Sequence, residues 1–290
     1  MKKTAVIATA LLLATSALAD DGEPPSTGLG VFVNAGGYWA DDKAADFYAG
    51  RPDNLNRIDY TLNGSLYGEQ IWNHLVNEGL LSPSAIGGYG QLSVEEYPKM
   101  EYRLSYQVGL GIRYDYASGM GWLLRFDFAK LQAIGAFNLG TGGSALLGSD
   151  QYIRCGIGAK EDRLNIDLGI TYTKALGRNL DLELDLGASL INTKVKDNTI
   201  EVAGGYWSIL DTWNGQQAEV GMTSYEYINQ GRLGYGVFSS LLLGYRVAGI
   251  GAIKVGYTVY QARICFEDRK VWGWQHMLGA RIEINNFSFI

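Results

Sequence analysis

The segment from Tyr102 to Tyr116, YRLSYQVGLGIRYDY, alternates between two kinds of side chain. Every even position is apolar or aromatic, and every odd position is polar, charged or glycine. Tyrosines lie toward both ends of the apolar face, and aliphatic side chains lie between them. Strict alternation over this length conflicts with a helical period and predicts a β-strand with one apolar and one polar face.

The same alternation recurs along the chain and predicts an all-β fold of about ten strands, with about eight to twelve possible. The other segments that carry it are 28–39, 120–128, 152–159, 163–173, 179–190, 199–210, 233–247, 253–259 and 272–284. The polar triplets 160–162 and 196–198 predict turns between strands. Glycine contributes 39 of 290 residues, near twice the usual share of about 7%, which indicates many strands with close backbone approaches.

The first 19 residues have the organisation of an export signal. Lys2 and Lys3 precede an apolar run that ends at Leu18, and the triplet 17–19 matches a signal peptidase site. We therefore expect residues 1–19 to be removed and residues 20–290 to form one domain. The chain has 24 basic and 30 acidic residues, so loss of the two lysines leaves 22 basic residues and a net charge of −8. That charge, without any basic run, disfavours nucleic-acid binding.

Lipid or the core of a soluble β-sandwich could accept the apolar faces. The strand predicted from Tyr102 to Tyr116 exceeds the about 9 to 11 residues that cross a bilayer. Between Tyr106 and Tyr114, a tilted strand covers about 19 Å of depth, which suits an apolar band of about 25 Å with aromatic girdles. These features favour lipid. The side chains that we expect to face it on this strand are Val108, Leu110 and Ile112.

With its export signal, alternating strands, aromatic girdles and aromatic-rich last strand, the chain resembles bacterial outer-membrane β-barrels over residues 28–290. The resemblance implies a closed antiparallel transmembrane barrel of the porin-like class in the outer membrane of a Gram-negative bacterium, with membrane lipid around it. Members of this class usually end on an aromatic residue, whereas this chain ends on Phe289-Ile290.

Charged side chains concentrate on the faces that such a barrel would turn inward. Mixed charges in a narrow lumen are expected to pair, because an unpaired buried charge is costly. The side chains that we expect to line the lumen are Arg103, Arg113, Asp115, Arg125, Asp127, Arg163, Asp167, Asp181, Glu183, Asp185, Arg232, Arg246, Lys254, Arg281 and Glu283. We therefore expect ion-pair networks that leave at most a thin water path.

The insertion 40–100 is the longest connection between the expected strands. Between Ser65 and Gly79, apolar residues recur along one broad stripe, which predicts a short amphipathic helix in the first long outer loop. Connections of this length are usually functional or folded in their own right.

Little in the sequence supports catalysis or metal binding. The two histidines, His74 and His276, lack the Asp-x-His dyad of the omptin proteases, which are also outer-membrane barrels. Cys155 and Cys265 could form a disulfide, although two separate thiols are favoured because Cys155 lies on the apolar parity of its segment. Two distant cysteines and two histidines are too few for a zinc site. We therefore expect a non-enzymatic protein without cofactor or metal.

Two functions remain open, with a barrel-embedded hydrolase as a distant third. In the first, the barrel is a narrow porin-like channel for small solutes, with the first long loop as a plug. In the second, the barrel is a closed scaffold whose outer loops bind a partner or surface, as in adhesion or envelope structure. The commoner role of such barrels favours the channel.

Overall fold

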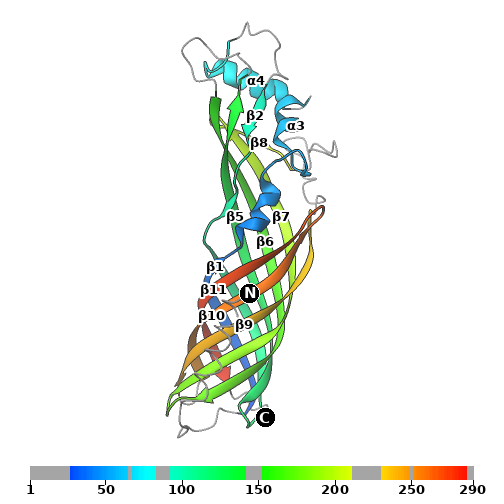
Figure 1. Ribbon diagram of the computed structural model, residues 1–290. Helices are drawn as coiled ribbons and strands as arrows, with labels where there is room; N and C mark the ends of the chain where they lie inside the picture. The colour runs from blue at the N-terminus through cyan, green and yellow to red at the C-terminus, as the bar shows by residue number, and fades with distance from the viewer. Residues whose placement is uncertain are drawn as a thin grey trace, which may run out of the picture.

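The computed structural model describes residues 27–64, 67–82, 92–141, 152–210, 230–247 and 251–285 (Figure 1). The expected export signal, residues 1–19, lies outside these ranges, as does Ser65.

Within the described residues, eight antiparallel strands form a closed ring. In ring order they are β1 (Gly28–Trp39), β4 (Ser105–Asp115), β5 (Met120–Gly140), β6 (Tyr152–Ala175), β7 (Leu180–Val202), β9 (Gly231–Val247), β10 (Gly251–Phe266) and β11 (Lys270–Asn285). The ring closes because β11 pairs with β1, from Gly30 opposite Asn285 to Trp39 opposite His276. The closed antiparallel barrel predicted from the sequence is confirmed, with its strand number inside the range of eight to twelve.

The ring has fewer strands than the central expectation of ten because two predicted turns are parts of strands. Residues 160–162 lie inside β6, where Lys160 pairs with Gln132 and Asp162 pairs with Lys130. Residues 196–198 lie inside β7. The segment 199–210 is the end of β7 and the short strand β8 (Gly205–Ser208), joined by a tight turn in which Ala203 has φ 49° and Gly204 has φ 83°.

Connection lengths alternate around the described ring. At one end the connections are short: 116–119, 176–179 and 248–250. At the other end, three of the four connections are long: 40–104, 141–151 and 203–230, while the fourth is 267–269. Outer-membrane barrels have short turns on the periplasmic side and longer loops outside the cell. The long-loop end is therefore the extracellular end, and both terminal strand ends lie at the opposite end.

Strands β5, β6 and β7 continue far beyond their neighbours on the long-loop side (Figure 1). They contain 21, 24 and 23 residues, whereas β1 and β4 contain 12 and 11. Three short strands extend this sheet: β2 (Ser93–Glu96) and β3 (Glu101–Tyr102) pair with β5, and β8 pairs with β7. We call residues 130–140, 152–162 and 193–208, with β2 and β3, the extension.

Residues 41–64 and 67–81 pack against the inner face of the extension and form what we call the cap. Its helical segments are α2 (Asp42–Ala45), η1 (Asp46–Tyr48), α3 (Ile58–Asn63) and α4 (Gly68–Asn77). The helix expected between Ser65 and Gly79 is α4. It ends in a Schellman motif, in which Gly79 has φ 71° and the Leu80 amide donates to the Leu75 carbonyl at 2.9 Å. No described helix is long and apolar enough to cross a membrane.

Candidate functional site: the barrel interior and its cap

Apolar side chains cover the outside of the barrel. Val108 and Leu110 are exposed, as the sequence predicts, and Ile112 is half-buried. Aromatic side chains lie at both ends of this apolar belt: Trp39, Tyr106, Tyr235, Trp272 and Trp274 toward the extension, and Tyr116, Tyr172 and Tyr245 toward the short turns. A closed barrel with an apolar exterior and aromatic girdles can satisfy its backbone in lipid. The fold is that of an outer-membrane β-barrel.

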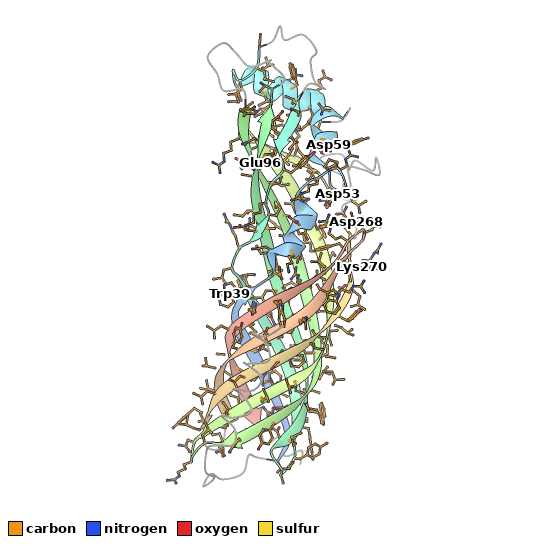
Figure 2. The ribbon with its side chains drawn as sticks, in the orientation of Figure 1. Trp39, Asp53, Asp59, Glu96, Asp268 and Lys270 are labelled. Atoms are coloured by element: carbon orange, nitrogen blue, oxygen red, sulfur yellow. The ribbon has the colours of Figure 1, made fainter. Side chains whose placement is uncertain are left out.

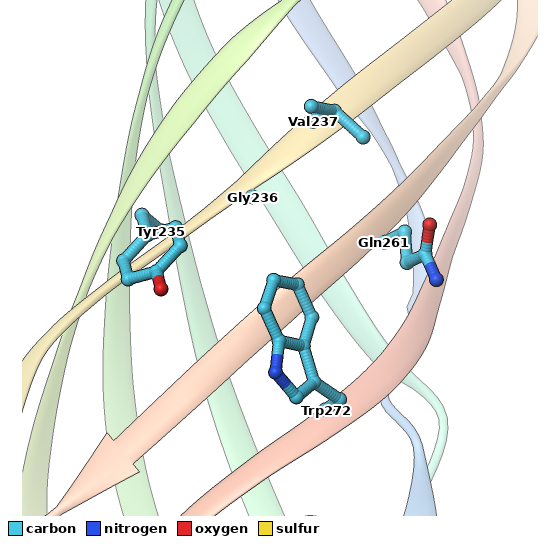
Figure 3. Close-up of a pocket in the computed structure, with 5 residues that line it drawn as sticks. All are labelled: Tyr235, Gly236, Val237, Gln261 and Trp272. Carbon is cyan, nitrogen blue, oxygen red and sulfur yellow. The ribbon is translucent and has the colours of Figure 1, made fainter.

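The aromatic side chains at the extension end of the apolar belt lie at the boundary between the barrel and the extension. Figure 2 shows Trp39 at the upper edge of the barrel, Asp268 and Lys270 at the β10–β11 turn, and Glu96 and Asp59 higher up. On the outside of β9–β11, Tyr235 and Trp272 meet edge to face at 5.8 Å beside an open depression of about 350 Å³ (Figure 3). Its lining is mainly apolar and lies on the lipid-facing side of the barrel.

The barrel interior is polar, and most of the residues predicted to line it are buried there. The twelve buried ones are Arg113, Asp115, Arg125, Asp127, Arg163, Asp167, Asp181, Glu183, Asp185, Lys254, Arg281 and Glu283. All of them except Asp181 form three clusters, which follow one another from the short-turn end to the cap.

The lower cluster is centred on Glu183, which is fully buried. This carboxylate accepts hydrogen bonds from Arg113, Lys254 and Arg281, the last at 2.5 Å. Glu283 also pairs with Arg113 at 2.8 Å and with Lys254 at 2.7 Å. Three cations from three different strands therefore converge on one pair of carboxylates.

Two further carboxylates complete the lower cluster. Asp115 accepts two hydrogen bonds from Arg113, at 2.7 and 2.8 Å, and Asp185 accepts one from Arg281 at 2.9 Å. Bidentate arginine–carboxylate geometry is strong and directional. The side chains of this cluster thus hold β4, β7, β10 and β11 together across the interior.

The middle cluster is built on Arg125, which lies 2.5 Å from Asp167 and 2.9 Å from Asp127. The Tyr260 hydroxyl lies 2.8 Å from the same guanidinium, and the Asn34 amide donates to Asp127 at 2.7 Å. The Arg125 guanidinium also lies 5.1 Å from the centre of the Phe238 ring. Polar and aromatic partners therefore surround the Arg125 guanidinium.

The upper cluster joins the barrel to the cap. Arg163 pairs with Glu161 at 2.5 Å and donates to Gln275 at 2.7 Å. Glu161 also accepts hydrogen bonds from Tyr48 of the cap and, at 2.8 Å, from Tyr102 of β3. Burial, with the charge of Glu161, raises the pKa of Tyr48 well above its ordinary value, so this hydroxyl stays protonated and donates.

Glycines on the inward face make room for these side chains. A Cβ on Gly109 would lie 1.9 Å from the Asp127 carboxylate, and a Cβ on Gly244 would lie 2.0 Å from the Asp181 carboxylate. A larger residue at either position would displace a charged partner. The high glycine content of the chain therefore partly reflects the bulk of the charged side chains inside the barrel.

Little free space remains among the three clusters. Beside Arg125 and Arg281 lies a cavity of about 20 Å³, bordered by Asn34, Thr258 and Met277. A single water needs about 10–15 Å³ of such volume, so this cavity has room for about one. Together with the burial of the charged side chains, this small cavity indicates a tightly packed polar core at the level of Arg125 and Arg281.

Two of the residues predicted to line the lumen, Arg103 and Arg232, lie on the outside, and a third, Arg246, lies at the end of the interior. Arg103 is exposed, because the strand breaks at 103–104 between β3 and β4. Arg232 is exposed and lies 3.1 Å from Glu267, because a register shift opposite Arg263–Cys265 reverses the side-chain parity at the end of β9. Arg246 is half-buried at the short-turn end, 3.8 Å from Asp181.

Above the charged clusters, the interior becomes apolar. Phe47 stacks on Phe266 with ring centres 4.2 Å apart, and α4 buries Ile71 and Leu75. The buried side chains of the extension that join this core are Ala133, Phe137, Leu139, Cys155, Ile157, Ala159, Val195, Ile200, Val202 and Trp207. The sequence pattern predicts α4 but not α2, η1 or α3, because these three segments are too short to show a helical period.

Both histidines have structural partners. His74 lies 3.0 Å from the Ala203 carbonyl and packs edge to face on Trp207, while His276 lies 2.5 Å from the Tyr257 hydroxyl. Both cysteines are free and buried. Among the described residues, no group of three or more His, Cys, Asp or Glu side chains is placed to hold a metal ion.

Solved structures with the same kind of fold are outer-membrane and surface proteins. Neisserial surface protein A is 9% identical, with a TM-score of 0.37 over 88% of this chain and 97% of that one. OprG from Pseudomonas aeruginosa is 13% identical, with a TM-score of 0.38 over 90% of this chain and 98% of that one. The attachment invasion locus protein Ail of Yersinia pestis is 11% identical, with a TM-score of 0.30 over 89% of this chain and 100% of that one.

Similarities at this level support no inference about what the chain does. No family model matches the chain, and no curated protein matches it.

Proposed function

We propose that this protein is a closed outer-membrane barrel that presents a folded structure at the cell surface, where the extension and the cap bind a partner or a surface. The observation that carries the proposal is the packed interior. Glu183, Asp185 and Arg163 are completely buried there. Glu183 and Asp185 pair with Arg281 across the interior, and Arg163 pairs with Glu161. A barrel whose interior is filled by paired charges is better suited to a scaffold than to a channel.

The contacts between cap and barrel also suit a support. The Trp274 amide donates to Asp41 at 3.0 Å, the Tyr102 amide donates to Asp42 at 2.8 Å, and Tyr48 donates to Glu161. The cap is therefore fastened to β11, β3 and β6 at once. A surface held at several points is pre-organised, which lowers the entropic cost of binding.

A narrow channel is the second candidate, because the interior is polar from Asp181 to Glu161. Planar-bilayer recording separates the two functions. A closed scaffold gives a silent bilayer, both for the wild type and after Asp181→Asn, Glu183→Gln and Asp185→Asn are combined. Reproducible single-channel conductance steps in the wild type that change in the triple variant would contradict the scaffold and support the channel.

Surface binding has its own test, on cells that display the protein. Glu69, Gln70 and Asn73 lie on the exposed face of α4. Changing all three to lysine is expected to reduce cell adhesion or aggregation by more than about tenfold, as expected for residues at the centre of an interface. Ser118→Lys in a short turn is the matched control, because that turn lies at the opposite end of the barrel. Equal adhesion of wild type, α4 variant and control would exclude α4 as the binding face.

We also propose that the protein is not an enzyme. His74 hydrogen-bonds to a backbone carbonyl and His276 to a tyrosine hydroxyl. Among the described residues, neither histidine hydrogen-bonds to a serine or a carboxylate. A hydrolase would need such a base beside its nucleophile or water.

A further inference from the structure

The outward faces of β5, β6 and β7 change character just above the apolar belt. Phe128 pairs with Leu164, and both are exposed. Two residues farther along each strand, Lys130 pairs with Asp162, which pairs in turn with Lys194. Both lysines are exposed. The first row beyond the apolar belt is therefore predominantly basic.

A third lysine joins this row through a bulge. The register shifts between Lys160 and Glu161, so that Lys196 and Asp197 both turn outward on β7. The Lys196 ammonium lies 3.5 Å from the Asp162 carboxylate. Three lysines thus lie next to one carboxylate, which leaves an excess of two positive charges, because the charge of Asp197 is balanced by Lys160 at 3.9 Å. We call Lys130, Lys194 and Lys196 the lysine row.

Immediately above the lysine row lies a groove of about 450 Å³. Gly156 and Gly158 leave its floor without side chains, and a Cβ on Gly158 would meet nothing within 4 Å. Its polar and aromatic lining comprises Arg103, Gln132, Lys160, Asp197, Thr199, Glu201 and Tyr206. Tyr206 lies above the apolar belt, and its side chain is nevertheless 68% exposed.

These features are stacked in a fixed order along the same strands. Residues two apart on one face are about 6.6 Å apart along a strand. From the belt upward, β6 presents Leu164, Asp162, Lys160, Gly158 and Gly156 in successive outward positions. Going up these strands, the outer face therefore changes from an apolar surface suited to acyl chains, to a row of cations, and then to a polar groove with an exposed aromatic ring.

We propose that this face binds a phosphorylated glycolipid of the outer leaflet. The acyl chains lie along Phe128 and Leu164, a phosphate lies at the lysine row, and a sugar ring occupies the glycine-floored groove against Tyr206. Amide, hydroxyl and carboxylate groups in the groove can pair with sugar hydroxyls, and lysine ammonium groups bind phosphate as point charges. The extension lies on the long-loop side of the barrel, where the outer leaflet is found. This site is separate from the partner surface proposed for α4.

Binding can be measured with the full barrel in phospholipid nanodiscs, using diphosphorylated lipid A as the probe. Lys130→Gln, Lys194→Gln and Lys196→Gln are combined, and all three side chains are exposed, so the fold is not at risk. The matched control combines Lys99→Gln, Arg232→Gln and Lys270→Gln, which removes three exposed charges elsewhere. The first variant is expected to lose at least about tenfold in affinity, given the electrostatic contribution of each lysine near a membrane surface. Equal loss in the control would overturn the proposal.

Two further comparisons test the phosphate and the sugar separately. Dephosphorylated lipid A should bind the wild type more weakly, and the lysine-row variant should no longer distinguish the two lipids. Gly158→Val fills the groove and should weaken lipid A binding while leaving phosphatidylglycerol binding unchanged. Phosphatidylglycerol that binds the wild type as tightly as lipid A, or a Gly158→Val variant with unchanged lipid A affinity, would overturn the assignment to a glycolipid.

Discussion

The lower and upper parts of β5–β7 are built from the same three strands but have opposite polarity. In the barrel, Asp127, Asp167 and Asp185 point inward while apolar residues face outward. In the extension, Phe137, Ile157 and Ile200 point inward while lysine, glutamine and threonine face outward. The change occurs near Glu161 and Arg163.

This difference reflects the solvent outside each part. Lipid accepts apolar side chains, so the polar groups of the barrel gather inside and must satisfy one another. Water covers the extension, so apolar side chains gather inside and are buried by the cap. One inward face therefore needs charge pairing and the other needs a hydrophobic partner, which explains why the first long connection is folded against the extension.

The largest expected effect comes from removing the centre of the lower cluster. Glu183→Ala leaves Arg113, Lys254 and Arg281 without their shared carboxylate. Loss of one partner from a buried ion pair costs about 3–5 kcal/mol, so we expect a decrease of about 4 kcal/mol in the free energy of unfolding from lipid vesicles in urea. The exposed Glu201→Ala is the control, expected to change it by less than about 0.5 kcal/mol. Similar losses of unfolding free energy in the two variants would contradict the account that paired charges stabilise the barrel interior.

Phe47→Ala should act on the upper region alone. Removing a ring stacked on Phe266 in the apolar core is expected to cost about 3 kcal/mol. Hydrogen exchange should therefore become faster in α3, α4 and the upper part of β7. Exchange should stay unchanged in the part of the β10–β11 ladder far from Phe266, from Gly251 to Thr258. Faster exchange in both regions would mean that barrel and cap unfold as one unit.

The outward face of the barrel and the outward face of the extension should differ in how well they tolerate a charged side chain. Leu168 is 62% exposed in the apolar belt, and Leu168→Arg is expected to destabilise the folded protein in lipid by about 2–3 kcal/mol. Ala136 is exposed on the extension, and Ala136→Arg should change the same free energy by less than about 0.5 kcal/mol. Equal costs at both positions would place the extension inside the membrane.

The smallest expected effect concerns the reactivity of the Cys155 thiol. Burial in the core of the extension, with the nearby charge of Glu201, raises the pKa of this thiol to about 12. The thiol is therefore protonated below that pH, and the thiolate is the reactive form. In a Cys265→Ser background, maleimide labelling at pH 8 should be slow in the folded protein and fast in urea. Fast labelling of the folded protein would contradict a closed core above the barrel.

Alternation in the sequence was sufficient to predict the barrel and the direction of most side chains, because a period of two fixes the face of each residue. It could not predict which charges meet: Arg113 and Glu183 are 70 residues apart, and ring closure brings them together. Polar triplets at 160–162 and 196–198 resemble turns because water-facing strand residues are also polar. Arg232 faces outward because of a bulge, and a bulge leaves little trace in local composition.

The polarity change along β6 is the central claim, and fluorophore scanning tests it most directly. Single cysteines at outward positions from 156 to 172, in a cysteine-free background, would carry an environment-sensitive fluorophore in lipid vesicles. The expected result is blue-shifted emission from Leu164 to Tyr172 and water-like emission at Asp162, Lys160 and Gly158. Blue-shifted emission that continues to Gly156, or that is absent from Leu168, would contradict it.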